Sequence, residues 1–213
     1  MAHFLHDRIS SAFLGAIPED WRMRVVRRRV LLTLVGITFT CTFNLTILTP
    51  LTMDPFAWTQ ALVWPGWFLL TAGLLLRSWA AGTLNKAREV TSTGPYALCR
   101  NPLYLGSLCI LLAFCWWCRD WLTVLLAAGP LGYVYGLQVR YEEQLLDAKF
   151  GQAWRDYAAT VPRLLPRQLP PRAAWAGWTF TRWRRNREYR ALGGVALGVL
   201  AVWLWQWLHS GGH

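Results

Sequence analysis

The sequence is poor in the residues that build disulfide frameworks, metal sites and acidic surfaces. The five cysteines are odd in number and scattered, which argues against a set of disulfides; they are Cys41, Cys99, Cys109, Cys115 and Cys118. The four histidines stand only near the two ends of the chain, so the sequence suggests no metal. Acidic residues number 11 against 22 Lys and Arg, and no internal repeat is present. The sequence therefore argues against a disulfide framework and gives no sign of a repeat protein.

One pair of cysteines, Cys115 and Cys118, has the spacing of redox and metal-binding motifs. No second ligand pair accompanies it, and two tryptophans stand between the cysteines. We interpret both cysteines as small apolar residues beside an interfacial tryptophan pair, with the redox or metal site as the alternative.

Long hydrophobic runs are abundant, and 54% of the residues are hydrophobic. Five apolar segments stand out, at residues 30–49, 57–81, 104–118, 121–139 and 191–208. A helix of about 20 residues crosses a hydrocarbon core of about 30 Å. The third segment is short and is followed at once by Arg119 and Asp120, so it predicts one arm of a tight helical hairpin. Gly129-Pro130 should kink the fourth. We predict an all-α integral membrane protein with about five transmembrane helices.

The positions of the basic residues predict the orientation of these helices. Residues 1–29 carry six Lys or Arg, the 82–103 loop with Arg77 carries four, and residues 140–190 carry eleven. Twenty-one of the 22 basic residues therefore fall on one side, as the positive-inside rule requires. We expect the amino terminus and both long polar segments to be cytoplasmic, in a bacterial inner membrane, with no cleavable signal. Membrane lipids are the expected partners. Nucleic acid is not, because a nucleic-acid module rarely carries so much apolar sequence.

Residues 140–161 predict an amphipathic helix that continues from the fourth span into the cytoplasm. Aromatic and apolar residues recur there at helical spacing, with acids and bases between them. Glu142 and Glu143 stand at its start, near the membrane surface; a solvated helix face is the alternative interpretation. Because the hairpin returns the chain to the same side, Arg100, Asn101 and Tyr104 should lie near these two glutamates. Such a pocket would suit a charged, zwitterionic small molecule beside a lipidic substrate.

Residues 173–190 mix tryptophan with arginine. We expect this stretch to lie at the lipid headgroups, where indole and guanidinium groups both settle. A dedicated site for anionic lipid or nucleic acid is the alternative.

Between residues 90 and 166 the chain resembles the isoprenylcysteine carboxyl methyltransferase and phospholipid methyltransferase superfamily. The residues that carry the resemblance are Gly94-Pro95-Tyr96, then Arg100-Asn101-Pro102-Leu103-Tyr104-Leu105-Gly106, then Glu142-Glu143, Phe150-Gly151, Tyr157 and Val161-Pro162. The resemblance implies S-adenosylmethionine bound at the cytoplasmic end of the carboxyl-terminal spans, with a lipidic or prenylated acceptor entering from the bilayer. No glycine-rich loop follows a strand, so a soluble Rossmann-type methyltransferase is excluded.

The resemblance also implies the site residues. The expected cofactor-binding residues are Gly94, Pro95, Tyr96, Arg100, Asn101, Pro102, Tyr104, Leu105, Gly106, Glu142, Glu143 and Tyr157. The expected catalytic residues are Arg100, Asn101, Tyr104, Glu142 and Glu143. Arg100 would pair with the cofactor carboxylate, with snorkelling to phosphates as the alternative. Either glutamate would accept from the cofactor amino group or ribose, or act as a base.

Two departures from the superfamily pattern concern the acceptor. Asn101 stands where many members have His, and Thr160 stands where the eukaryotic isoprenylcysteine enzymes have a basic residue before the Val-Pro pair. Arg163 is a candidate replacement for that basic residue. The expected reaction is O-methylation of a carboxylate, the first alternative is N-methylation of a phospholipid headgroup, and the more distant one is a sterol-reductase-like NADPH enzyme.

The resulting domain organisation has four parts. Residues 1–29 form a basic cytoplasmic segment, and residues 30–82 contain the first two spans. Residues 83–166 form the expected catalytic core of loop, hairpin and amphipathic helix, and residues 167–213 contain the interfacial segment and the last span.

Overall fold

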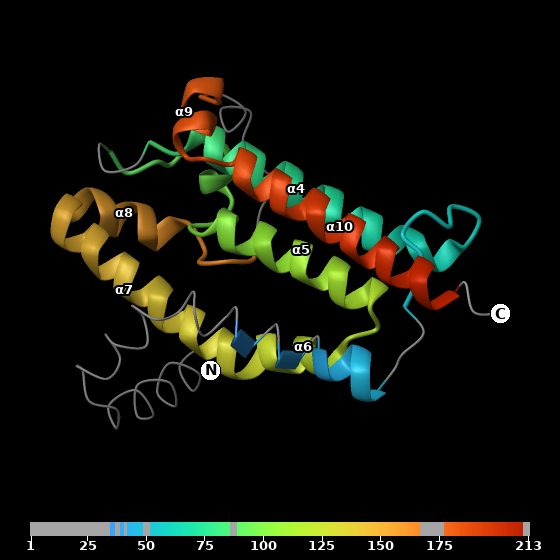
Figure 1. The fold of residues 1–213 in the computed structure, drawn as a ribbon. Helices are drawn as coiled ribbons and strands as arrows, with labels where there is room; N and C mark the ends of the chain where they lie inside the picture. Colours follow the sequence, from blue (N-terminus) through green and yellow to red (C-terminus); the bar gives the residue numbers. More distant parts are fainter. Residues whose placement is uncertain are drawn as a thin grey trace.

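The computed structural model describes residues 35–36, 39–40, 42–48, 52–85, 89–166 and 177–210. These residues form helices and no strands (Figure 1). In chain order the helices are η1 (Asn44–Leu48), η2 (Ala61–Val63), α4 (Trp64–Thr83), η3 (Gly94–Ala97), α5 (Pro102–Trp117), α6 (Trp121–Leu126), η4 (Ala127–Leu131), α7 (Gly132–Phe150), α8 (Gln152–Thr160), α9 (Phe180–Arg185) and α10 (Tyr189–Ser210).

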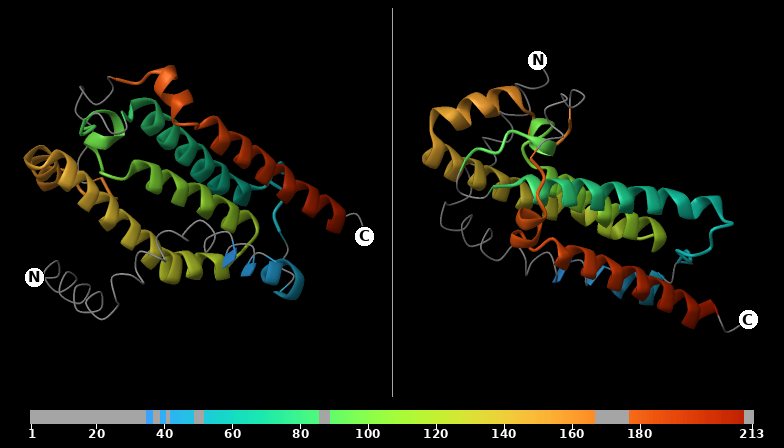
Figure 2. Two further views of the ribbon diagram at one scale, coloured as in Figure 1. Left: turned by 60° about the vertical axis from the view of Figure 1, so that its left-hand side comes forward. Right: turned by 90° about the horizontal axis from the view of Figure 1, so that it is seen from above.

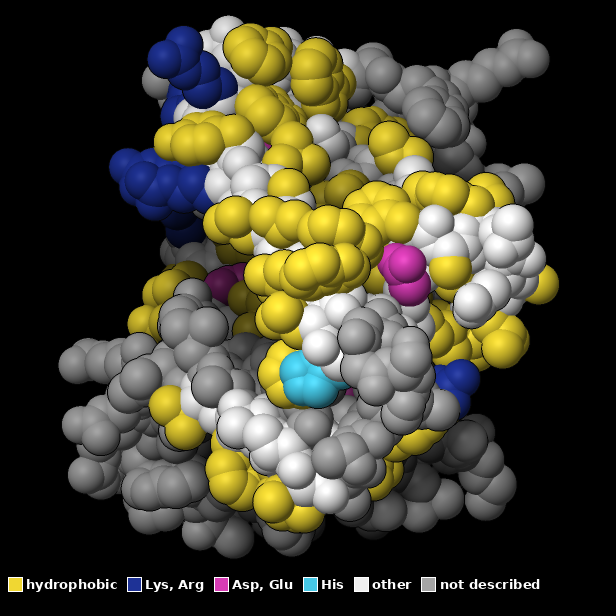
Figure 3. Space-filling view, turned by 45° about the vertical axis from the view of Figure 1, so that its right-hand side comes forward, with side chains coloured by type: hydrophobic (Ala, Val, Ile, Leu, Met, Phe, Trp, Pro, Cys, Tyr) yellow, Lys and Arg dark blue, Asp and Glu magenta, His cyan; other side chains and the backbone are white. Residues whose placement is uncertain are grey.

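Three of these helices are long and apolar enough to cross a membrane, Ala61–Thr83, Trp121–Phe150 and Tyr189–His209. Helix α5 is apolar but shorter, as the hairpin prediction requires. Large hydrophobic side chains lie on the outside, and Figure 3 shows them covering much of one face of the molecule. The predicted all-α integral membrane class is confirmed. The first predicted span, 30–49, lies only partly within the described residues, and the orientation in the membrane stays a prediction.

Helices α4 and α5 pack side by side through small residues (Figures 1 and 2). A Cβ atom on Gly73 would lie 2.7 Å from the Gly106 carbonyl oxygen, so glycine at these positions allows the two backbones to approach closely. Trp117, fully buried, fills the space beside Gly66 at the other end of this contact. Val199 of α10 joins the same buried cluster. The core therefore lies where α4, α5 and α10 meet.

The predicted hairpin is present between α5 and α6. Pro102 begins α5, where its missing N–H is not needed. Asp120, fully buried, caps α6 by accepting hydrogen bonds from the Thr123 backbone N–H at 2.9 Å and from the Thr123 hydroxyl at 2.6 Å. The predicted kink at Pro130 takes the form of the π-helix η4, which joins α6 to α7 without a break.

The prediction of one continuous helix over residues 140–161 is wrong at Gly151. Helix α7 ends at Phe150, and Gly151 has φ of 54°, a left-handed conformation that glycine adopts readily. Helix α8 then folds back beside α7 (Figure 1). This reversal buries Trp154 and Tyr157, whose burial offsets the interruption of the helix.

A buried ion pair ties α4 to the start of α10. The Arg77 guanidinium donates from Nε to Glu188 Oε1 at 2.8 Å and from Nη2 to Glu188 Oε2 at 3.0 Å. Its Nη1 donates to the Ser107 hydroxyl and, at 3.4 Å, to the Leu103 carbonyl of α5. Three helices therefore meet at one arginine.

Candidate functional site

The polar loop before α5 is held against the end of α4 by a glycine. Gly94 has φ of +63°, and a Cβ atom there would lie 2.7 Å from the Thr83 hydroxyl oxygen. Only glycine fits this position without displacement of its neighbour. The following Tyr96 is buried, and its carbonyl oxygen accepts a hydrogen bond from the Tyr157 hydroxyl at 2.7 Å. Burial raises the pKa of both phenols, so Tyr157 remains a hydrogen-bond donor across the working pH range.

The same loop is also hydrogen-bonded to the chain that follows α8. The Arg100 N–H donates to the Pro162 carbonyl at 2.8 Å, and the Asn101 N–H donates to the Arg163 carbonyl at 3.1 Å. The Asn101 side-chain amide adds a second bond to that carbonyl at 3.2 Å. The backbone of the Arg100 turn therefore positions the Val161-Pro162 pair. The two motifs are hydrogen-bonded to each other although they are about 60 residues apart in the sequence.

Arg100 and Glu143 form an ion pair in which Glu143 is shared with a third residue. The Arg100 Nη1 lies 3.1 Å from Glu143 Oε1, and the Arg163 Nη2 lies 2.9 Å from Glu143 Oε2. The Arg100 and Glu143 side chains are 14% and 12% exposed, against 47% for Arg163. Burial lowers the pKa of Arg100, while Glu143 acts in the opposite direction. Among the described residues, the buried Nε of Arg100 has no hydrogen-bond partner.

Glu142 points to a different set of partners. Its Oε1 accepts from the Tyr104 hydroxyl at 3.1 Å and from the Gln138 side-chain amide. Tyr135 packs edge-on against Tyr104, with ring centroids 5.6 Å apart. Gln138 and Tyr135 were not predicted from the sequence. They lie four and seven residues before Glu142 and so share its helix face, a signal that the sequence contained.

The predicted proximity of the Arg100 turn to the paired glutamates is confirmed by these contacts. Gly106 lies elsewhere, because it packs against the Arg77 side chain and the Gly73 carbonyl of α4. Pro95 and Pro102 are buried and shape the backbone of the loop. The roles of all the predicted site residues in cofactor binding stay predictions.

A surface hollow of about 710 Å³ opens beside this cluster, between α7 and α8. Of the predicted site residues, Glu143 lines it, together with Arg163, Arg140 and Asp147. A second, mostly apolar groove of about 650 Å³ lies between α5 and α10, and Arg77 and Ser107 are in its lining. Within the described part of the chain, no group of three or more His, Cys, Asp or Glu side chains is placed to hold a metal ion.

Comparison with known proteins identifies the segment that contains this cluster. Residues 61–153, from η2 into α8, match the phospholipid methyltransferase family. The predicted superfamily is thereby confirmed for this segment. The match indicates a membrane methyltransferase, and it includes Arg100, Tyr104 and both glutamates.

The chain is also similar to a curated bacterial protein. The nickel-cobalt-cadmium resistance protein NccN of Alcaligenes xylosoxydans xylosoxydans is 28% identical over 111 residues, which are 51% of this chain and 52% of the relative. The chain thus spans about half the length of that relative. No solved structure gave a significant match.

Proposed function

We propose that this protein is an S-adenosylmethionine-dependent integral membrane methyltransferase that acts on a lipidic or hydrophobic acceptor at the cytoplasmic membrane surface. The cluster of Arg100, Asn101, Tyr104, Glu142 and Glu143 would be its active site. The proposed reaction is O-methylation of a carboxylate, as in the isoprenylcysteine carboxyl methyltransferases. The observation that carries the proposal is the buried guanidinium of Arg100, whose Nε has no hydrogen-bond partner among the described residues.

An unsatisfied buried donor is costly, and such groups occur at sites that receive a ligand. Arg100 is charged, is held by the backbone bond to Pro162, and has one ion-pair contact to Glu143 through Nη1. A carboxylate can therefore bind the guanidinium without breaking the pair. The amino-acid carboxylate of S-adenosylmethionine fits this donor in charge.

The two glutamates would have different roles. Both oxygens of Glu143 are engaged by arginines, so we assign it to positioning Arg100. Glu142, held by Tyr104 and Gln138, would accept from the cofactor amino group or ribose. When bound, S-adenosylmethionine supplies the electrophilic methyl group. The residues of this chain orient the two reactants and exclude water, contributions that together amount to several kcal/mol.

Calorimetry of the purified full chain with S-adenosylhomocysteine tests the cofactor. We expect binding by the wild type and its loss in Arg100→Ala. Arg155→Ala is the matched control, because Arg155 is also paired with a carboxylate of α7, Asp147, but on an exposed surface. Unchanged affinity in Arg100→Ala would contradict the assignment. Binding of NADPH instead of S-adenosylhomocysteine would favour a reductase.

The acceptor is tested by the pH dependence of turnover. A carboxylate is already anionic at neutral pH, whereas an amine with a pKa of about 10 must lose a proton before it attacks. We expect Glu142→Gln to weaken cofactor binding and to leave the pH profile unchanged at saturating cofactor. Normal cofactor affinity with a collapsed rate and an altered acidic limb would instead identify Glu142 as a base. That result would favour N-methylation of a phospholipid headgroup, the alternative to which the description of the matching family corresponds.

A further inference from the structure

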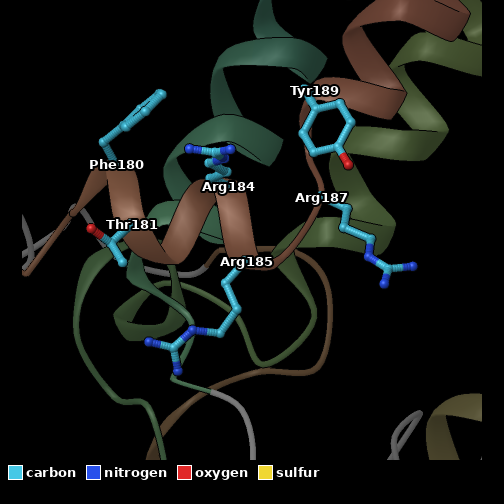
Figure 4. Close-up of a pocket in the computed structure, with 6 residues that line it drawn as sticks. All are labelled: Phe180, Thr181, Arg184, Arg185, Arg187 and Tyr189. Carbon is cyan, nitrogen blue, oxygen red and sulfur yellow. The ribbon is translucent and has the colours of Figure 1, made fainter.

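A shallow basic hollow lies at the start of α10, away from the Arg100 cluster. It has a volume of about 780 Å³ and is lined by Phe180, Thr181, Arg184, Arg185, Arg187 and Tyr189. Figure 4 shows the side chains of Arg185 and Arg187 extending away from the α9 ribbon. Three arginines therefore line this hollow, and no acidic residue is in its lining.

The fold anchors α9 through residues other than these three arginines. The Trp183 indole donates to the Ser78 hydroxyl at 2.9 Å, and the Asn186 amide donates to the Ala81 carbonyl at 2.8 Å. In the part of the chain that the structure describes, no hydrogen bond or ion pair engages the guanidinium groups of Arg184, Arg185 and Arg187. The arginines that line the hollow are thus not needed to attach α9 to α4.

Arg187 occupies a backbone position that normally favours glycine. Its φ is 58°, and it directly follows the cap of α9. The Arg187 N–H donates to the Arg184 carbonyl at 3.0 Å, and the Glu188 N–H donates to the Trp183 carbonyl at 3.4 Å. These two bonds form a Schellman motif, in which the left-handed residue is usually glycine. A non-glycine residue in this conformation points to a use for its side chain.

The position of the hollow at the start of α10 indicates which anion it would bind. Tyr189 begins the last membrane-length helix, so the hollow lies at the boundary between that span and water. Phe180 and Tyr189 are 60% and 48% exposed, and aromatic side chains of this kind settle at the headgroup level. Figure 3 shows Lys and Arg side chains gathered mainly at one edge of a largely hydrophobic face. A lipid phosphate would reach a side chain at this level directly.

We propose that this hollow binds the phosphodiester of an anionic glycerophospholipid through Arg184, Arg185 and Arg187. Phe180 and Tyr189 lie against the glycerol and the upper acyl chains. The site does not depend on the proposed methyltransferase activity. It also assigns a purpose to the left-handed Arg187, which the hydrogen bonds of the helix end alone do not explain.

The test uses the purified full chain in detergent, with phosphatidylglycerol and phosphatidylcholine titrated separately and binding followed by native mass spectrometry. The decisive variant is Arg187→Gly, because glycine suits the left-handed backbone and removes the guanidinium. We expect an unchanged or higher melting temperature and about fivefold weaker binding of phosphatidylglycerol. Arg184→Gln should weaken binding by a similar factor. Phosphatidylcholine should bind more weakly to the wild type and be little affected by either variant.

Arg119→Gly is the matched control. Arg119 is also a left-handed arginine, with φ of 50°, but it lies in the α5–α6 turn at the other end of the bundle (Figure 1). We expect it to bind phosphatidylglycerol as the wild type does. The proposal is overturned if Arg187→Gly keeps its affinity, if Arg119→Gly loses as much, or if the wild type does not prefer phosphatidylglycerol. Competition by millimolar inorganic phosphate would also overturn it, because the site would then take free phosphate.

Discussion

Two arginines near the same end of the bundle, Arg77 and Arg100, each pair with a glutamate that is at most 12% exposed, yet their surroundings differ. Arg77 donates from Nε and Nη2 to the two oxygens of Glu188 and from Nη1 to α5, so all three of its nitrogens are engaged. Arg100 contacts Glu143 through one nitrogen, shares that glutamate with Arg163, and has a buried Nε without a partner among the described residues. Arg77, whose nitrogens all have partners, holds helices together. Arg100, which has a nitrogen without a partner among the described residues, is able to bind a ligand.

The largest expected effect comes from breaking the ion pair between Arg77 and Glu188. Arg77→Met leaves Glu188 buried without its partner, and removal of one member of a buried pair costs about 3–5 kcal/mol. For a chain of this size we expect the melting temperature in detergent to fall by about 10 °C. Arg100→Met should cost far less, because Glu143 keeps Arg163. The double variant Arg77→Met/Glu188→Leu should recover much of the loss. Equal melting temperatures for Arg77→Met and the wild type would contradict the assignment of Arg77 as a fastening residue.

The difference between these two arginines also shows which features can be predicted from the sequence and which cannot. Apolar segment lengths and the charge distribution predicted the helices and the tight hairpin, because both follow from local pattern. The hairpin geometry predicted that the Arg100 turn meets Glu142 and Glu143. The separate orientations of the two glutamates were not predictable, because they depend on which side chains of α5 and of the 161–163 segment lie opposite each one.

Pairs that are distant in the chain were missed for a related reason. Arg77 and Glu188 are 111 residues apart, and nothing in the local sequence of either residue indicates the other. Gly151 was recognised as part of a motif but not as a helix end. The helix ends at Gly151 because the reversal of the chain there buries Trp154 and Tyr157. Tertiary packing decided each of these features.

An effect of intermediate size is expected for the reactivity of Cys99, which tests whether water reaches the Arg100 turn. Burial raises the pKa of the Cys99 thiol, next to Arg100, to about 11. Only the thiolate reacts with alkylating reagents. A variant that retains Cys99 alone should therefore react with iodoacetamide at pH 8 at least about twentyfold more slowly than a model thiol of pKa about 8.5. The rate should rise about tenfold per pH unit between pH 8 and 10. A rate that levels off near pH 9 would show that water reaches this turn.

The smallest expected effect concerns Arg163, the second arginine that pairs with Glu143. Arg163 pairs with Glu143 at 2.9 Å, but its side chain is 47% exposed. Exposed ion pairs contribute about 1 kcal/mol or less, because water screens them and the side chain loses freedom. Arg163→Gln should therefore change the affinity for S-adenosylhomocysteine less than about threefold, measured by calorimetry beside Arg100→Ala. If Arg163 holds an acceptor carboxylate in place of the basic residue absent at Thr160, the variant should raise the KM for the acceptor and leave cofactor affinity unchanged. A loss of cofactor binding as large as that in Arg100→Ala would instead identify Arg163 as a main anion-binding residue. The comparison of Arg77 with Arg100 would then not identify the arginine that binds the ligand.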